Sequence, residues 1–279
     1  MASLVNDTFV APASAGKLYA GRSAMSGIGN ARVAVWGQSN AVGRALQSDL
    51  SSSPLSSDAE LADYMNGGLP FSRVLIWKSA SFETLTSTNT GCDAGQFGPE
   101  FGLAVRWMRE TVSGNLYIEK WSSSGSSITA NLFVPGVWPY TTAIAWRSSA
   151  DAWLSERGLS IDKEGWVWIQ GESDNAMSQA TYQGHLEALM SSLQTDGVRP
   201  AGNTDVLVQM ASTSAMYGAG VAAAKAAIAS ANPARTKVVD APGGAGYMKG
   251  DNLHQNGRGQ LQMAYNAFEL IFGAPHIGV

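Results

Sequence analysis

Short apolar runs alternate with longer amphipathic segments along most of this sequence. Six runs are rich in β-branched and aromatic residues and too short for helices, which predicts buried strands at 33–36, 73–77, 116–118, 166–169, 205–210 and 237–240. Helical spacing of apolar residues predicts helices near 41–47, 100–110, 140–154, 182–193, 220–231 and 257–272. This alternation predicts a parallel sheet with helices on both faces.

The 279 residues contain no internal repeat and no linker of domain length. Residues 1–31 are rich in small and polar side chains and predict an N-terminal extension or arm, whereas residues 32–279 predict one domain. A hydrophobic content of 45% is enough for a substantial core.

Charge and hydropathy exclude several kinds of partner. A net charge of -4, with scattered lysines and arginines, argues against a nucleic acid and against an anionic membrane surface. No run approaches about 20 consecutive apolar residues, so we expect no transmembrane helix. The N-terminus lacks the basic and apolar parts of a secretory signal, so we expect no signal peptide. The sequence predicts neither a compartment nor an oligomeric state.

The sequence offers no pattern for a metal or a cofactor. A single cysteine, Cys92, excludes an internal disulfide and a thiolate metal cluster, and we expect it to have no role in the chemistry. The glycines at 27 and 29 precede a predicted strand instead of following one, so they are not a dinucleotide fingerprint. We therefore expect no metal and no cofactor.

Ser39 lies where the first predicted strand passes into a helix, in the run Gly37-Gln38-Ser39-Asn40. A serine on such a turn has its hydroxyl at the carboxyl end of a parallel sheet, beside free N–H groups of a helix start. It is therefore a candidate nucleophile. The alternative is that Ser39 only caps the helix, as serines commonly do.

A nucleophilic serine needs a neutral imidazole to take its proton and a carboxylate to orient that imidazole. Of the three histidines, His185 lies in a predicted amphipathic helix and His276 in the C-terminal tail. His254 lies in a loop, three residues after Asp251, and is the remaining candidate. An Asp-x-x-His pair on its own is also an ordinary loop pattern.

Four polar blocks of the sequence resemble, in order, those of the SGNH hydrolases: Gly37-Gln38-Ser39-Asn40, Phe97-Gly98-Pro99-Glu100, Gln170-Gly171-Glu172-Ser173-Asp174 and Asp251-x-x-His254. They resemble most the branch of sialic-acid-specific acetylesterase-like proteins, also called carbohydrate esterase family 6. Residues 120–128 resemble a weaker form of a further segment, with Ser124 in place of the first of two adjacent glycines. The resemblance covers roughly residues 32–272.

The resemblance implies an α/β fold, a three-layer α/β/α sandwich of flavodoxin-like type, with a central parallel sheet of about five strands. It implies that Ser39 is the nucleophile. His254 would act as general base and then as general acid, and Asp251 would orient it.

The resemblance also implies an oxyanion hole that consists of the backbone N–H of Ser39, the backbone N–H of Gly98 and the side-chain amide of Gln170. Neutral, fixed donors of this kind stabilise the negative charge that develops during acyl transfer. The alternative for Gln170 is that it only ties loops together.

Glu172 is expected to support the site by anchoring loops around Gln38 or Asn40. The implied function is a serine esterase that removes O-acetyl groups from carbohydrate, either acetylated polysaccharide or sialic acid, through an acyl-enzyme intermediate. An esterase for small non-carbohydrate acyl esters stays open. So does a carbohydrate-binding or carbohydrate-modifying module of a virus tail or surface assembly.

Bulky rings in the loops expected to wall the cleft, at Phe97, Trp121 and residues 133–138, predict little room beyond an acetyl group. We therefore expect longer acyl chains to react poorly.

Overall fold

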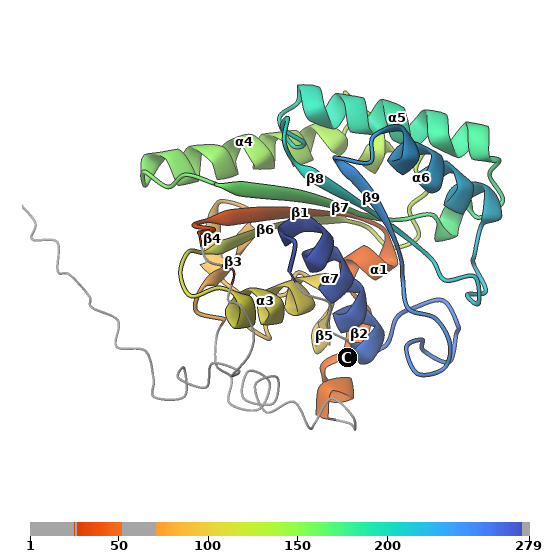
Figure 1. The fold of residues 1–279 in the computed structure, drawn as a ribbon, viewed down its shortest axis with the longest axis horizontal. Helices are drawn as coiled ribbons and strands as arrows, with labels where there is room; N and C mark the ends of the chain where they lie inside the picture. Colours follow the sequence, from red (N-terminus) through yellow and green to blue (C-terminus); the bar gives the residue numbers. More distant parts are fainter. Residues whose placement is uncertain (1–24, 26, 52–70, 275–279) are drawn as a thin grey trace, which may run out of the picture.

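The computed structural model describes residues 25, 27–51 and 71–274. Its central sheet has the strand order β4-β3-β6-β1-β7-β8-β9 (Figure 1). The strands are β1 (Ala31–Gly37), β3 (Val74–Lys78), β4 (Ser81–Thr84), β6 (Leu116–Ser122), β7 (Lys163–Ile169), β8 (Thr204–Gln209) and β9 (Thr236–Asp240). The short strands β2 (Ala45–Leu46) and β5 (Gln96–Phe97) form a separate antiparallel pair.

The helices are α1 (Ser39–Val42), α3 (Pro99–Glu110), α4 (Tyr140–Glu156), α5 (Gln179–Thr195), α6 (Ala219–Ala231) and α7 (Gly257–Phe272). Short 3-10 helices within the described residues are η2 (Gln47–Ser51), η4 (Asn131–Phe133) and η5 (Glu172–Asp174). No helix within the described residues combines the length and the hydropathy that a membrane crossing requires.

The predicted α/β sandwich is confirmed, and all six predicted strands lie in one sheet. The sheet is larger than the expected five strands, because the sixth run forms β9 and because β4 adds an antiparallel edge strand beside β3. The sequence of β4 does not predict a strand because it has only four residues, of which Phe82 alone is buried.

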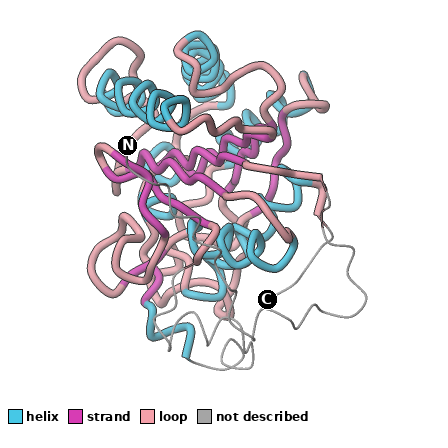
Figure 2. Tube along the Cα trace, turned by 90° about the vertical axis from the view of Figure 1, so that its left-hand side faces the viewer, coloured by secondary structure: helices cyan, strands magenta, loops and turns pink. Residues whose placement is uncertain are grey.

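Both faces of the sheet are covered by helices, as Figure 2 shows for the strands between two helical layers. Val33 and Val35 of β1 face a core shared with α3 and α7, whereas Ala34 and Trp36 face the core beneath α5 and α6. This explains why β1 reads as a continuous apolar run: alternate residues enter different cores, and neither face meets water.

The strand order contains the flavodoxin-like arrangement β6-β1-β7-β8-β9. The chain reaches β6 on one side of β1 and β7 on the other. Ligand sites in such sheets lie at the carboxyl ends of the strands, at the point where the strand order reverses. That position here is the end of β1, where α1 begins (Figure 1).

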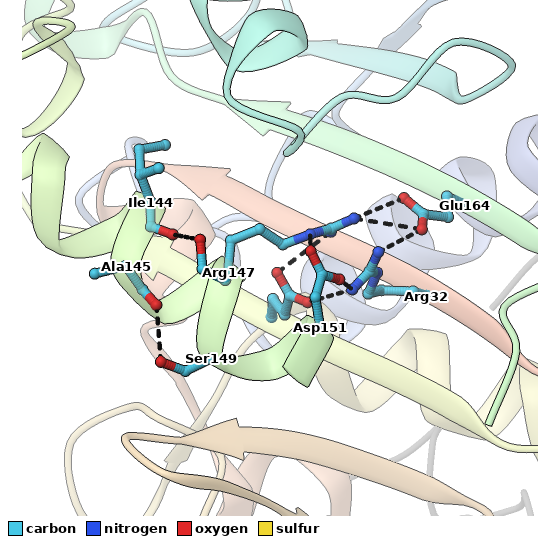
Figure 3. Close-up of polar contacts among 9 residues, drawn as sticks. Arg32, Ile144, Ala145, Arg147, Ser149, Asp151 and Glu164 are labelled. Carbon is cyan, nitrogen blue, oxygen red and sulfur yellow. Dashed lines mark hydrogen bonds and ion pairs between the residues drawn. The ribbon is translucent and has the colours of Figure 1, made fainter. Parts of the chain in front are cut away.

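An ionic network around the buried Arg32 and Arg147 joins the first half of β1 to α4 (Figure 3). Arg32 contacts Asp151 and Glu164 at 2.5 Å each, and Arg147 contacts Glu164 at 3.1 Å. Burial acts to lower the pKa of Arg32, but the surrounding carboxylates, Glu119 foremost, outweigh it and raise the pKa. Arg32 lies five residues before Gly37, roughly 17 Å along the strand from its carboxyl end, so the network serves helix docking.

Most of the predicted arm, residues 1–31, lies outside the described residues, and its boundary stays a prediction. The last part of this segment contacts the domain. Gly29 donates a hydrogen bond to Asp162, and Asn30 accepts one from the backbone of Asn115.

Candidate active site

Gly37 brings the end of β1 against the end of β7. The backbone φ angle of Gly37 is 148°, a value that glycine adopts readily and other residues rarely. A Cβ atom at this position would overlap the carbonyl oxygen of Ile169. The following residue, Gln38, donates its backbone N–H to that same carbonyl at 2.9 Å. The strand-to-helix turn is therefore fixed against β7.

Ser39 is the first residue of α1, and Gln38 precedes it as the N-cap residue without a side-chain capping bond. Ser39 is therefore not the capping residue, so the alternative in which it serves only as an N-cap is wrong. The side chain is 5% exposed. Its own backbone N–H belongs to the first turn, where a helix offers no internal acceptor.

Asp251 and His254 are in direct contact in the loop that precedes α7. The Nδ1 atom of His254 lies 2.7 Å from Oδ2 of Asp251. The backbone N–H groups of Leu253 and His254 donate to Oδ1 at 2.9 and 3.0 Å. With Nδ1 directed at the carboxylate, the Nε2 atom of a neutral ring is left as an acceptor.

Hydrogen bonding sets the protonation of Asp251. Partial burial acts to raise its pKa, but the bonds from the His254 ring and from two backbone N–H groups outweigh burial and lower the pKa to about 2. Asp251 is therefore ionised at neutral pH and holds His254 by an acceptor-only carboxylate.

Asn40 connects the segment of Ser39 to that of His254. It is fully buried, and its Oδ1 accepts the backbone N–H of Gln255 at 3.0 Å while its Nδ2 donates to the carbonyl of Leu253 at 3.2 Å. The same Nδ2 donates to Oε1 of Glu172 at 2.8 Å. The residues on both sides of His254 are thus held by the neighbour of Ser39, and Glu172 contacts Asn40.

Gln170, directly after β7, is buried and already uses its side-chain amide. Its Nε2 donates to Gln38 Oε1 at 3.3 Å, to the carbonyl of Ser126 at 3.2 Å and to Asp174. Its Oε1 accepts from the Tyr182 hydroxyl at 2.7 Å. These bonds tie loops together, so Gln170 presents no uncommitted donor in this arrangement.

Asp174 has a positioning role that sequence reasoning did not assign, although the residue stands in the quoted Gln170–Asp174 block. Its Oδ1 accepts from the hydroxyl of Ser127 at 2.5 Å and its Oδ2 from the backbone of Ile128 at 2.7 Å. Asp174 therefore fixes the loop after β6 against the end of β7.

Gly98 lies against the end of α1, since a Cβ atom on it would come within 2.8 Å of Gly43 Cα. Its backbone N–H donates to Oε1 of Glu100 at 2.7 Å. This differs from the expected open donor, because the carboxylate two residues later occupies the N–H. Glu100 is itself held by a buried ion pair with Lys120, at 2.7 Å.

Cys92 lies beside Glu100 and Lys120. Its Sγ donates to the carbonyl of Val42 at 2.8 Å and lies 3.2 Å from the Nζ atom of Lys120. Burial first, and then the Glu100 carboxylate, raise the pKa of Cys92 to about 12, so the thiol stays protonated.

Lys225 of α6 is a second buried group that the sequence did not reveal, because it stands in an alanine-rich helix without a motif. Its Nζ donates to the carbonyls of Gln170 at 2.5 Å and Val208 at 2.6 Å. Burial lowers its pKa to about 8, against the opposing charges of Glu172 and Asp174. Lys225 thereby holds together the ends of β7 and β8.

The expectation that Phe97 and Phe133 wall the cleft is wrong. Phe97 is buried against Phe101, with ring centroids 5.3 Å apart, and Phe133 is buried against Trp168 at 4.9 Å. Both loops place an aromatic side chain inward as an anchor, which a sequence of one loop does not distinguish from an exposed ring. Trp138, by contrast, is 74% exposed.

No group of three or more His, Cys, Asp or Glu side chains within the described part of the chain is arranged to hold a metal ion. Ser39 begins α1 at the end of β1, and the loop with the Asp251–His254 pair is tied to α1 by Asn40. The fold is that of SGNH-type esterases.

A protein-family model described as "Carbohydrate esterase, sialic acid-specific acetylesterase" matches residues 18–271. The chain belongs to this family of carbohydrate acetylesterases, whose members are ester hydrolases. A search of curated proteins found no match.

Solved structures share the fold at low sequence identity. A protein from Arabidopsis thaliana is 20% identical, with a TM-score of 0.59 over 85% of this chain and 94% of that one. NanS is 13% identical, with a TM-score of 0.54 over 86% and 96%. A carbohydrate acetylesterase from Xanthomonas citri is 12% identical, with a TM-score of 0.51 over 89% of this chain and 58% of that one.

Proposed function

We propose that this protein hydrolyses O-acetyl esters of carbohydrates, with Ser39 as nucleophile, His254 as general base and Asp251 as the group that orients His254. The observation that carries the proposal is the Asp251–His254 pair in a loop that Asn40 ties to the first turn of α1. Family membership supplies the class of substrate, an acetylated carbohydrate.

In the proposed reaction, Nε2 of His254 takes the proton of the Ser39 hydroxyl as its oxygen attacks the acetyl carbonyl. The imidazolium then gives the proton to the departing sugar oxygen, which leaves acetyl-Ser39. Water attacks this ester with the same assistance, releases acetate and restores the serine. The ionised Asp251 stabilises the imidazolium at each stage.

The Ser39 N–H is the first donor to the oxyanion, because it lies in the first turn of α1 and has no helical acceptor. Gly98 and Gln170 complete the oxyanion hole in this proposal. For this, the substrate oxygen has to displace Glu100 from the Gly98 N–H and share Nε2 of Gln170 with its present acceptors. Both residues then contribute most in the transition state, when the oxygen is charged.

Hydrolysis of an aryl acetate by the wild type and by Ser39→Ala tests the nucleophile. Loss of one triad member lowers kcat by on the order of 10⁴ to 10⁶. Ser149→Ala, an exposed serine on α4, is the matched control and should retain full activity. A fluorophosphonate should add its mass to the wild type and to Ser149→Ala but not to Ser39→Ala. A Ser39→Ala enzyme with a tenth of wild-type turnover would rule out this assignment.

A series of aryl acetate, butyrate and octanoate separates an acetylesterase from an esterase for general short-chain esters. A misfit methylene costs about 1–3 kcal/mol in a close-fitting acyl pocket, or roughly ten- to two-hundredfold in kcat/KM. We expect acetate to be the best of the three. Equal rates for octanoate and acetate would favour the non-carbohydrate alternative.

A further inference from the structure

An open groove with a volume of about 490 Å³ lies at the carboxyl ends of β8 and β9. The loops that line it follow these two strands and extend beyond the same sheet edge as α1 (Figure 1). Its polar and aromatic walls include Gln209, Ser212, Thr213, Tyr217 and Asp240. The proposed reaction uses none of these residues.

The groove adjoins the loop that carries the Asp251–His254 pair. Asn252 donates its Nδ2 to the carbonyl of Thr213 at 2.9 Å, and Gln255 donates its Nε2 to the carbonyl of Pro242 at 3.1 Å. Each wall of the groove is thus bonded to a residue next to Asp251 or His254. A ligand in the groove would therefore lie beside the proposed catalytic loop.

The spacing of the strands sets the distance from Ser39. β8 is the second strand from β1 and β9 the third, so their ends lie roughly 10 to 15 Å along the sheet edge from that of β1. An acetyl group at Ser39 and the sugar that carries it do not span this distance. A neighbouring sugar of the same oligosaccharide does.

The chemistry of the walls suits an uncharged, hydroxyl-rich ring. Tyr217 is 36% exposed and offers an aromatic face to the apolar face of a sugar. The side-chain amide of Gln209 donates to Oδ1 of Asp240, so Oδ2 of Asp240 is the carboxylate oxygen that can accept a hydrogen bond from a sugar hydroxyl. The hydroxyls of Ser212 and Thr213 can accept or donate hydrogen bonds to further sugar hydroxyls. The nine described lining residues include one carboxylate and no lysine or arginine, so an anionic sugar has no counter-charge there.

We propose that this groove binds a neutral sugar unit next to the acetylated one, so that the enzyme prefers acetylated oligosaccharides to acetylated monosaccharides. The inference rests on the proposed esterase function and adds a second binding region to it. Tyr217 stacks on the sugar ring, and Asp240 accepts its hydroxyl hydrogens.

Three substrates test the groove in parallel: an aryl acetate, an O-acetylated neutral monosaccharide, and the O-acetylated trisaccharide of the same sugar. We expect the wild type to show its highest kcat/KM with the trisaccharide. Tyr217→Ala should lower kcat/KM for the trisaccharide about tenfold, the effect of a contact worth about 1.4 kcal/mol, and leave the aryl acetate within twofold. Tyr217→Phe, which keeps the ring, should restore trisaccharide activity.

Val112→Ala is the control variant, because Val112 is exposed and lies just before β6, at the amino end of the sheet. A further arm replaces the neutral substrate by an O-acetylated oligosaccharide that ends in sialic acid, which we expect to be the poorer substrate. Asp240→Lys should reduce the difference in kcat/KM between the neutral and the sialylated oligosaccharide, because the lysine supplies a counter-charge to the sialic acid.

The groove is excluded if the trisaccharide is no better than the monosaccharide, if all three substrates lose activity together in Tyr217→Ala, or if the sialylated substrate is preferred. In each of these cases the wild type still hydrolyses the aryl acetate, so the proposed function stands. A wild type inactive on every ester would instead refute the proposed function, and the groove proposal with it.

Discussion

Asp251 holds His254 at two points, through the ring Nδ1 at 2.7 Å and through the backbone N–H at 3.0 Å. One carboxylate therefore fixes both the position of the residue and the orientation of its ring. A rotation of the imidazole away from this geometry would break the first bond without breaking the second. The contact between Nδ1 and Asp251 is therefore the one that sets the orientation of the His254 ring.

This pair predicts the pH dependence of hydrolysis. Because the pKa of Asp251 is lowered to about 2, the carboxylate stays ionised throughout an ordinary assay range. We expect kcat/KM for an aryl acetate to rise with pH to a plateau, since only a neutral imidazole accepts the serine proton. The measurement is kcat/KM from pH 4.5 to 9. A rate that falls as pH rises through this range would contradict the assignment.

Gln170→Ala should lower kcat far more than it raises KM. One oxyanion donor contributes roughly 3–4 kcal/mol, and mainly in the transition state. The substitution also frees an acceptor of the buried Asp174, so the thermal midpoint has to be measured alongside the kinetics. If kcat stays within twofold and only the thermal midpoint falls, Gln170 ties loops and does not act on the oxyanion.

Lys225 predicts a rise in stability at alkaline pH. Its folded-state pKa is about 8, below the ordinary 10.5, so between these values the unfolded chain holds a proton that the folded protein has released. The free energy of unfolding then increases with pH across this interval. We expect the wild type to gain stability relative to Lys225→Met between pH 8 and 10.5, measured by urea unfolding. If the difference in the free energy of unfolding between the wild type and Lys225→Met stays constant from pH 8 to 10.5, folding does not disfavour the charged form of Lys225.

Glu164→Gln should destabilise the protein without changing its esterase chemistry. Glu164 faces both Arg32 and Arg147, and removing one partner of a buried ionic group costs about 3 kcal/mol. The exposed Glu156, which pairs with Arg157 at the surface, gives the matched control, and Glu156→Gln should change stability by less than about 1 kcal/mol. The free energy of unfolding of both variants is measured by urea unfolding. Equal decreases in Glu164→Gln and Glu156→Gln would contradict the proposed role of Glu164 as the partner of two buried arginines.

The sequence predicts the layers of this fold well, because the sheet is buried on both faces and its strands are continuous apolar runs. It predicts β4 poorly, since an exposed edge strand with one buried residue has no such pattern. Ser39, Asp251 and His254 are proposed from motif and resemblance. The partners of Gln170 in distant segments, Gln38 and the carbonyl of Ser126, are not, because only the folded chain brings them together.

The burial of Phe97 and Phe133 is a second feature that the local sequence does not predict. Each stands in a loop rich in glycine or proline, where an exposed ring and an inward anchor have the same local sequence. Whether the ring is buried depends on Phe101 and Trp168, which lie on other elements. Packing partners of this kind become visible only in three dimensions.

Asn40 makes the three segments it joins interdependent. Its side chain bonds Glu172 after β7 and the backbone of Leu253 and Gln255 before α7, while its own backbone lies in the first turn of α1. Substitutions in these segments should therefore not have additive effects, because each changes the bonding available to the others. We therefore expect that a foreign version of one segment functions in this protein only when it preserves the bonds to Asn40.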